Sequence, residues 1–186
     1  LLPNNPDIIQ GVTLSDANLF YKAIEKQQSA KITEFNSIAW KTLNDSALYN
    51  IKNESFENID REIVSGTYVL ENITSQILSI KIKDIEKTEH LLKWMSDSVS
   101  VKVEAKIYKV NKNFEQVFSF TRNDFKNTYA MLNENQLLFF SNKSVLNYYL
   151  QAIEGNQFLG KNPSFMSYAE DNLTLECNYL YYENSK

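Results

Sequence analysis

Hydrophobic and polar residues alternate along the middle of the chain with a period of two. From Leu78 to Lys83, aliphatic residues occupy every second position, and serine or lysine occupies the positions between them. This pattern is typical of an antiparallel strand with one buried and one solvated face. The segment 101–107 alternates in the same way and is predicted to be one strand. Leu137–Phe140 is apolar at every position, which predicts a central strand buried on both faces.

Shorter patterns indicate the other strands and the turns between them. Asparagine-rich segments at 111–113 and 133–135 are predicted hairpin turns, because asparagine tolerates the left-handed backbone that such turns need. The polar segment Asn44–Glu62 is predicted to be a long surface connection. The remaining predicted strands are Asp7–Leu14, a strand that Tyr68 and Leu70 open, Val117–Phe120, Tyr129–Leu132 and Leu173–Tyr182.

Apolar residues at helical spacing predict the helices. They are 15–28 with Ser15 as N-cap, 35–43, 85–94 with Asp84 as N-cap, 144–154 and 164–169. Strands and helices together predict an α+β fold, with a largely antiparallel sheet of about seven or eight strands and helices packed on it. We expect residues 1–186 to form a single domain of this kind.

An internal repeat is suggested by two similar segments. Asn18–Glu25 aligns with Asn147–Glu154, and the N-cap candidates Ser15 and Ser144 fall in the same register. The alignment predicts a strand–helix–short helix unit used twice, at about residues 7–43 and 136–170, in a pseudo-symmetric sheet. The alternative is that two amphipathic helices resemble each other by chance.

Composition and charge limit the chemistry that the chain can perform. The net charge is −4 and no basic cluster stands out, which argues against nucleic-acid binding. The chain has one cysteine, Cys177, and one histidine, His90, so neither an intrachain disulfide framework nor a zinc site of the usual kind can be built. We therefore predict no metal and no cofactor. No apolar run is long enough to predict a transmembrane helix.

Candidate catalytic residues are weakly supported. The carboxylates Glu54, Glu57 and Asp60, and the pair Glu170 and Asp171, lie in polar segments where a solvated position is expected. The chain lacks the Gly-x-Ser-x-Gly motif and a glycine-rich phosphate loop. These observations favour a protein that is not an enzyme.

Tyrosines are the candidate interaction residues. Tyr148, Tyr149 and Tyr182 are predicted to form a surface that contacts a protein partner, a peptide or a glycan. The alternative places aromatic residues of the last strand in the core, with Tyr179 and Tyr181 beside Cys177, a buried structural thiol, and Tyr182 on the opposite side.

From Tyr129 onward the chain reads Tyr-Ala-Met-Leu-Asn-Glu-Asn-Gln-Leu-Leu-Phe-Phe-Ser, then a helix, then Gly155–Leu159 and Asn162–Phe165. With the proline-containing start and helix from Leu2 to Ile24, this pattern resembles an uncharacterised family of Bacteroidetes cell-envelope proteins. The resemblance covers most of the chain. It implies a location in the periplasm or at the outer-membrane surface, and a longer, secreted or lipid-anchored protein of which this chain is the N-terminal part. It supplies no activity and no site residue.

The expected function is therefore a non-enzymatic binding or scaffolding domain outside the cytoplasm. It would recognise another protein through a face or an edge of the sheet. One alternative is a carrier of a lipid or other apolar ligand between helices and sheet. The other is a carboxylate-based enzyme.

Overall fold

The computed structural model describes residues 2–16, 19, 57–103, 105–111, 129–172 and 179–184. Several predicted features lie outside these residues. The predicted helix 35–43, the predicted strand 117–120 and Cys177 lie wholly outside them. Most of the predicted helix 15–28, the turn 111–113 after Asn111, and the first part of the strand 173–182 also lie outside.

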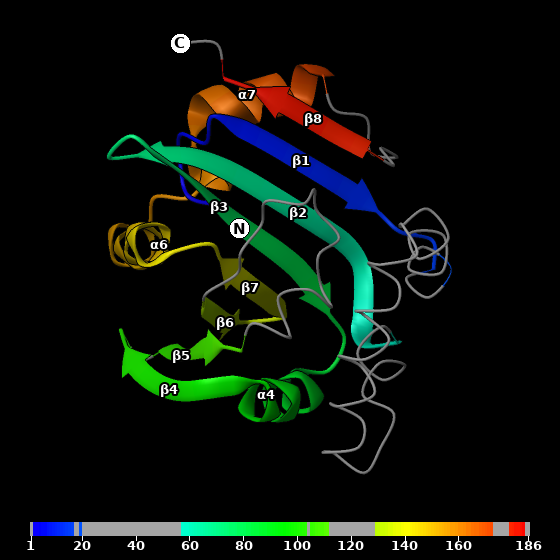
Figure 1. Ribbon diagram of the computed structural model, residues 1–186. Coiled ribbons are helices and arrows are strands. Elements are labelled where there is room, and N and C mark those ends of the chain that lie inside the picture. Colours follow the sequence, from blue (N-terminus) through cyan, green and yellow to red (C-terminus); the bar gives the residue numbers. More distant parts are fainter. Residues whose placement is uncertain are drawn as a thin grey trace, which may run out of the picture.

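The described strands form one antiparallel sheet of eight, in the order β4-β5-β6-β7-β3-β2-β1-β8 (Figure 1). This arrangement confirms the predicted α+β fold with an antiparallel sheet. The sheet runs from β8 at the top of Figure 1 to β4 at the bottom. The strands are β1 (Ile8–Thr13), β2 (Ile59–Leu70), β3 (Ile73–Ile82), β4 (Ser96–Lys102), β5 (Ala105–Val110), β6 (Tyr129–Asn133), β7 (Gln136–Phe140) and β8 (Tyr179–Glu183).

The helices in the described part of the chain are α4 (Ile85–Trp94), α6 (Lys143–Gly155), α7 (Pro163–Asn172) and the short 3-10 helix η1 (Leu159–Lys161). Asp84 is the N-cap of α4, as predicted, because its carboxylate accepts a 3.0 Å hydrogen bond from the backbone N–H of Lys87. The predicted cap of α6, Ser144, is wrong. Asn142 caps this helix instead, and its Oδ1 accepts a 3.0 Å bond from the N–H of Val145.

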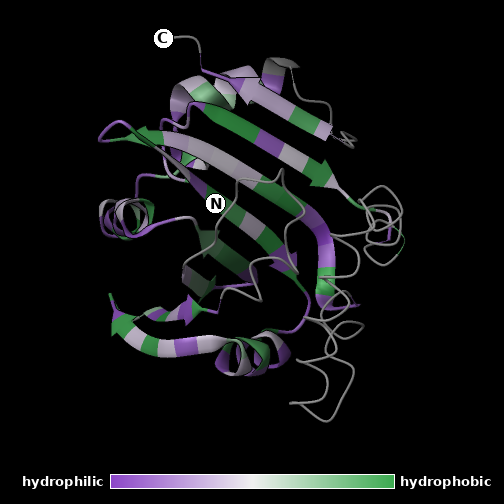
Figure 2. Ribbon diagram, viewed as in Figure 1, coloured by the Kyte–Doolittle hydropathy of each residue, from purple (hydrophilic) through white to green (hydrophobic). Residues whose placement is uncertain are grey.

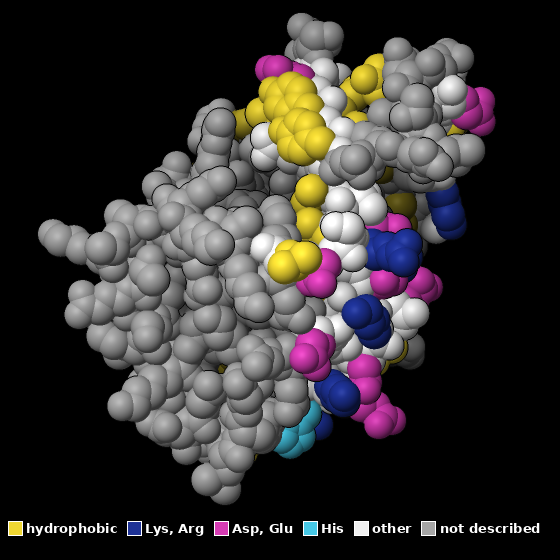
Figure 3. Space-filling model, turned by 90° about the vertical axis from the view of Figure 1, so that its right-hand side faces the viewer, with side chains coloured by type: hydrophobic (Ala, Val, Ile, Leu, Met, Phe, Trp, Pro, Cys, Tyr) yellow, Lys and Arg dark blue, Asp and Glu magenta, His cyan; other side chains and the backbone are white. Residues whose placement is uncertain are grey.

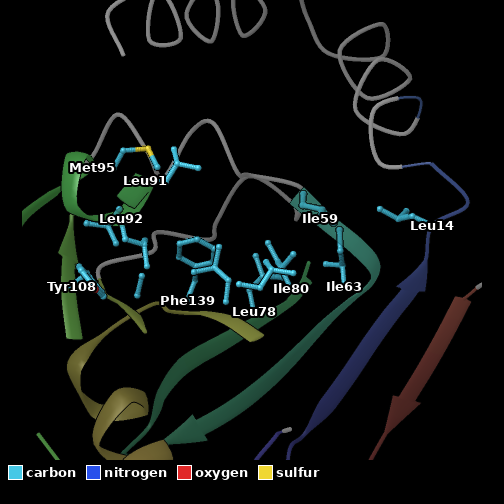
Figure 4. Close-up of a cluster of buried hydrophobic side chains, with 14 residues drawn as sticks. Leu14, Ile59, Ile63, Leu78, Ile80, Leu91, Leu92, Met95, Tyr108 and Phe139 are labelled. Atoms are coloured by element: carbon cyan, nitrogen blue, oxygen red, sulfur yellow. The ribbon is translucent and has the colours of Figure 1, made fainter. Parts of the chain in front are cut away.

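Two hydrophobic cores lie on opposite faces of the sheet. The first is covered by Leu91 and Leu92 of α4 and by Met95, which point toward Tyr108 and Phe139 of the sheet (Figure 4). The second is covered by α6. The buried side chains of this helix pack on Ile77, Leu138 and Phe140 of the sheet. They are Val145, Leu146, Tyr149 and Leu150. Each fully buried aliphatic or aromatic side chain contributes about 1.5–3 kcal/mol to stability.

The central strands β3 and β7 are buried on both faces. In β7, Leu138, Phe139 and Phe140 each have an exposed fraction of 0%, which confirms the predicted central strand. Figure 2 shows the hydrophobic residues concentrated in this part of the sheet. The prediction that β3 has a solvated face is wrong at its centre, where Ser79 is 4% exposed. Its hydroxyl donates a 2.7 Å hydrogen bond to Gln136 Oε1 of β7, so the buried serine has a hydrogen-bond partner without contact with water.

Strand β2 begins earlier than its sequence predicts. Residues 44–56 of the predicted surface connection Asn44–Glu62 lie outside the described residues. The end of that segment belongs to β2, which begins at Ile59, so Tyr68 lies near the end of the strand instead of at its start. The register of β2 with β3 shifts between Ile59 and Ile63, and Figure 1 shows β2 bending at this end. The acidic residues here face Lys81 of β3, whose Nζ lies 3.8 Å from Asp60 Oδ2 and 3.4 Å from Glu62 Oε1. The charged residues at this bulge made the start of β2 look like a loop in the sequence, although it is paired with β3.

The hairpin turns between the described strands differ in how well the sequence predicts them. Glu71 and Asn72, between β2 and β3, have φ angles of 51° and 64°, the left-handed pair of a type I′ turn. The predicted hairpin at 133–135 is confirmed, with Glu134 at φ 50° between β6 and β7. The predicted single strand 101–107 is wrong. The chain reverses inside it, so that Lys102 of β4 faces Ala105 of β5.

The internal repeat is not confirmed. The helix of its first copy lies outside the described residues, and its second copy contains β7, α6 and α7. Asp16 Oδ1 accepts a 3.0 Å hydrogen bond from the N–H of Leu19, which is a capping contact. In the alignment that pairs Asn18 with Asn147, Asp16 falls on Val145, whereas the cap of α6 is Asn142. The two capping residues are therefore out of register.

Candidate functional site at the sheet edge

Strand β4 forms one edge of the sheet, and its partner among the described strands is β5. The strand follows α4 directly. At this junction the N–H of Met95 donates to Leu91 O over 3.1 Å, and the N–H of Asn111 donates to Met95 O over 2.9 Å. These bonds tie the end of the helix to the end of β5. Helix α4 thus fixes where the edge strand begins.

Strand β4 is exposed on both of its faces. Every residue from Asp97 to Lys102 is exposed. Val99 is 50% exposed and Val101 is 68% exposed, values that are high for β-branched aliphatic residues. Figure 2 shows hydrophobic and polar positions alternating along this strand. The edge therefore presents apolar side chains and a row of backbone groups together.

The opposite edge strand, β8, differs in one respect. Its residues Leu180 and Tyr182 are half-buried against the core that α6 covers, so one face of β8 is covered. Its other face carries Tyr179, which is 61% exposed, and Tyr181, whose hydroxyl donates a 3.0 Å bond to Glu183. Of the two edges of the described sheet, β4 is the one exposed on both faces.

The two faces of β4 have different chemistry. Val99 lies opposite Tyr108 and Val101 lies opposite Lys106, on the side of the sheet where α4 packs. Ser98, Ser100 and Lys102 lie on the other side. There, Ser98 lies opposite Lys109 of β5.

On the α4 side, the lysine charge is compensated. Glu89 Oε1 accepts hydrogen bonds from Lys106 Nζ over 2.5 Å and from Tyr108 OH over 3.3 Å, and it lies 3.4 Å from Lys93 Nζ. The hydrogen bond from Lys106 is the main cause that lowers the pKa of Glu89 below its usual value. On the other side, Lys102 and Lys109 are both exposed, and within the described ranges no carboxylate forms an ion pair with either.

An exposed tryptophan adjoins the edge strand. Trp94, the last residue of α4, is 50% exposed, and its ring centroid lies 6.4 Å from that of His90. Figure 3 shows basic and acidic side chains mixed on the described part of one face of the molecule. Neither Trp94 nor the valines of β4 were predicted from the sequence to be surface residues. The Ser-x-Ser-Val-Ser-Val segment lacks large core side chains, which indicates an exposed strand but not its position at an edge.

The predicted tyrosine surface is corrected at Tyr149. This residue has an exposed fraction of 0% and packs between Phe140 and Phe158, with ring centroids 5.2 and 5.8 Å away. Burial raises the pKa of Tyr149 to about 12. Its neighbour Tyr148 is half-buried, and its hydroxyl donates a 2.8 Å bond to the carbonyl of Asn4. Neither ring is a free surface group.

The third predicted residue, Tyr182, is half-buried beneath α7. Its ring lies 5.8 Å from that of Phe165 and 5.1 Å from that of Tyr168, so its neighbours differ from those of Tyr148 and Tyr149. The alternative prediction for this strand is also wrong, since Tyr179 and Tyr181 face outward. The reason is register: Tyr182 pairs with Ile9, on the face that packs against α7 and α6.

The described carboxylates give no catalytic cluster. Asp60 takes part in the surface ion pairs with Lys81, and Glu57 is exposed. Glu54 and the side chain of Asp171 lie outside the described residues. Within the described part of the chain, no three His, Cys, Asp or Glu side chains are grouped as metal ligands would be. The non-enzymatic character and the carrier and enzyme alternatives stay predictions.

No helix that the structure describes is long and apolar enough to cross a membrane. Comparison of the chain with protein-family models, curated proteins and solved structures found no match. The resemblance to Bacteroidetes envelope proteins therefore stays a hypothesis.

Proposed function

We propose that this chain is a non-enzymatic binding or scaffolding domain that acts outside the cytoplasm and captures a protein partner by strand addition at β4. In strand addition, an extended segment of the partner forms backbone hydrogen bonds with an exposed edge, and side-chain pockets select its sequence. The observation that carries the proposal is the exposure of β4 on both faces, with Val101 68% exposed. The location outside the cytoplasm rests on the family resemblance.

An edge is favoured over a face of the sheet because helices already occupy the centres of both faces. Helix α4 covers one core and α6 covers the other. Large exposed apolar residues at an edge are a liability that proteins usually remove with charges, bulges or a covering element. In β4 such devices flank the valines without replacing them: the register shifts around Asp97, and Lys102 ends the strand. This arrangement suits a strand that accepts selected partners.

The expected affinity is modest. A partner strand paired with seven residues of β4 forms an interface near or below the lower size limit of stable complexes. Burying the exposed parts of Val99 and Val101 contributes about 1 kcal/mol each, against the entropy of ordering the partner segment. We therefore expect a dissociation constant on the order of 1 μM, as for a transient complex.

Site-specific photo-cross-linking tests this proposal. A photoreactive amino acid is placed at Val101, and in a matched control at Val69, which is 50% exposed and lies near the end of β2 on a different part of the sheet. The tagged chain is cross-linked in its native cell envelope. We expect one specific protein adduct from position 101 and none from position 69. Equal adducts from both positions, or an adduct from position 69 alone, would contradict binding at β4.

A further inference from the structure

We infer that the partner segment of β4 alternates acidic residues with β-branched apolar residues. This inference rests on the proposed function and specifies the partner of the same site. It is carried by the two faces of the edge, which present lysines on one side and valines on the other.

The acidic positions follow from Lys102 and Lys109, which form no ion pair with any carboxylate that the structure describes. Residues directly opposite each other in an antiparallel pair share a face of the sheet. A partner residue opposite Ser98 or Lys102 therefore lies on the side of Lys102 and Lys109. Lys106 is different, because Glu89 already binds it on the α4 side. Opposite charges across strands contribute about 0.2–1 kcal/mol per pair, so two lysines favour two carboxylates.

The apolar positions follow from the valines. Partner residues opposite Val99 and Val101 lie on the α4 side, between the edge strand and solvent. Here a β-branched residue completes a cross-strand pair with each valine and removes it from water. Polar residues at these positions would leave the valines solvated.

A second copy of the chain fits this edge less well. A symmetric antiparallel pair that places Val99 opposite Val101 of the other copy is centred on Ser100. The same symmetry places Lys102 of each copy opposite Ser98 of the other, which neighbours Lys109. Two lysines from each copy would then share one face. The described carboxylate of β4, Asp97, would fall opposite the turn residue Val103, beyond the ladder. Like charges on neighbouring strands destabilise such a pair.

Two capped synthetic peptides test the inference, one alternating glutamate with valine and one alternating lysine with valine. Binding to the chain is measured by fluorescence anisotropy at low and raised salt, and the binding site is located by NMR shifts of backbone amides. We expect the glutamate peptide to bind about tenfold more tightly than the lysine peptide, with its advantage reduced by salt. The shifts should centre on Ser98–Lys102.

Charge reversal provides the matched control. The double variant K102E/K109E should invert the preference and bind the lysine peptide more tightly. The double variant K87E/K143E makes the same change in net charge at exposed lysines in the first turns of α4 and α6, where glutamate suits the helix dipole. It should keep the preference for the glutamate peptide.

The possible failures are distinguishable. Equal binding of both peptides, with shifts in β4, would overturn the acidic preference and leave strand addition standing. Shifts outside β4, or none with either peptide, would overturn the proposed function as well. Self-association in sedimentation experiments that V101E abolishes would identify a second copy as the occupant and overturn the inference.

Discussion

Asn58 Nδ2 donates a 2.6 Å hydrogen bond to Thr88 Oγ1 in the buried space between the start of β2 and α4. The same amide nitrogen donates to Asp84 O over 2.9 Å, and Asn58 Oδ1 accepts from the N–H of Asp84 over 2.7 Å. Thr88 Oγ1 in turn donates to Asp84 O over 2.8 Å. These bonds hold the first turn of α4 on the sheet. Because α4 leads directly into β4, they also set the position of the edge strand.

The replacement N58A should lower the free energy of unfolding by about 2–3 kcal/mol, because it removes several bonds and leaves buried groups unsatisfied. T88V alone should cost about 1–2 kcal/mol. Urea denaturation of both single variants and the double variant measures their coupling, which we expect to be about 1 kcal/mol. Additive effects within about 0.3 kcal/mol would show that the two side chains do not act as one unit.

Gly66 in β2 lies in a tight environment. A Cβ at this position would meet Leu2 Cδ1 and Tyr68 Cε2 at 3.0 Å each. Tyr68 is 1% exposed and its hydroxyl donates to the carbonyl of Pro3, so its ring has little room to move. We expect G66A to destabilise the protein by about 1–3 kcal/mol through overpacking.

Gly11 in β1 is the matched control. A Cβ there would make ordinary contacts, the nearest being Leu180 Cβ at 3.5 Å. G11A should be neutral, or stabilising by about 0.5 kcal/mol, because alanine reduces the entropy of the unfolded chain. Thermal denaturation of both variants checks the pair. A loss in G11A as large as that in G66A would refute the steric account.

Part of this structure could be predicted from local sequence alone. Leu137–Phe140 identified a central strand because every position is apolar, and Asp84 identified the start of α4 because aspartate caps the backbone locally. The β4–β5 turn could not be predicted in this way. Its residue Val103 has φ 49°, a conformation that β-branched residues rarely adopt, so no turn signal interrupts the alternation.

The candidate site was harder to predict, because an edge is a property of strand order. The residues of Ser96–Lys102 do not indicate that this strand has a neighbouring strand on only one side in the described sheet. The tyrosines were ambiguous for another reason, since their rings are apolar and their hydroxyls are polar. For Tyr149, helical spacing does predict burial. This residue follows Val145 by four positions and precedes Ala152 by three, which places it on the buried stripe of α6.

The buried phenol of Tyr149 should make stability depend on alkaline pH. Its pKa is raised from 10.0 to about 12, mainly by burial, so the folded state retains this proton while the unfolded state loses it. The stabilising contribution is complete below pH 10 and is lost as the pH rises toward about 12. In this window it falls by up to about 1.4 kcal/mol per pH unit.

The variant Y149F removes this titration and also the 3.1 Å bond from Asn133 Nδ2 to the hydroxyl. It should be less stable near neutral pH by about 1 kcal/mol and should show a shallower loss of stability above pH 10. Y179F, at an exposed ring, is the control and should keep the wild-type slope. Parallel curves for Y149F and the wild type would contradict a raised pKa at Tyr149.

Amide hydrogen exchange on the free chain and on its complex with the cross-linked partner tests binding at β4 most directly. In an antiparallel edge strand, alternate N–H groups point away from the neighbouring strand and exchange with solvent. We expect those amides within Ser98–Lys102 to exchange rapidly in the free chain and to become protected in the complex, with β8 unchanged. Unchanged exchange throughout β4, with protection at β8 or α6 instead, would contradict strand addition at this edge.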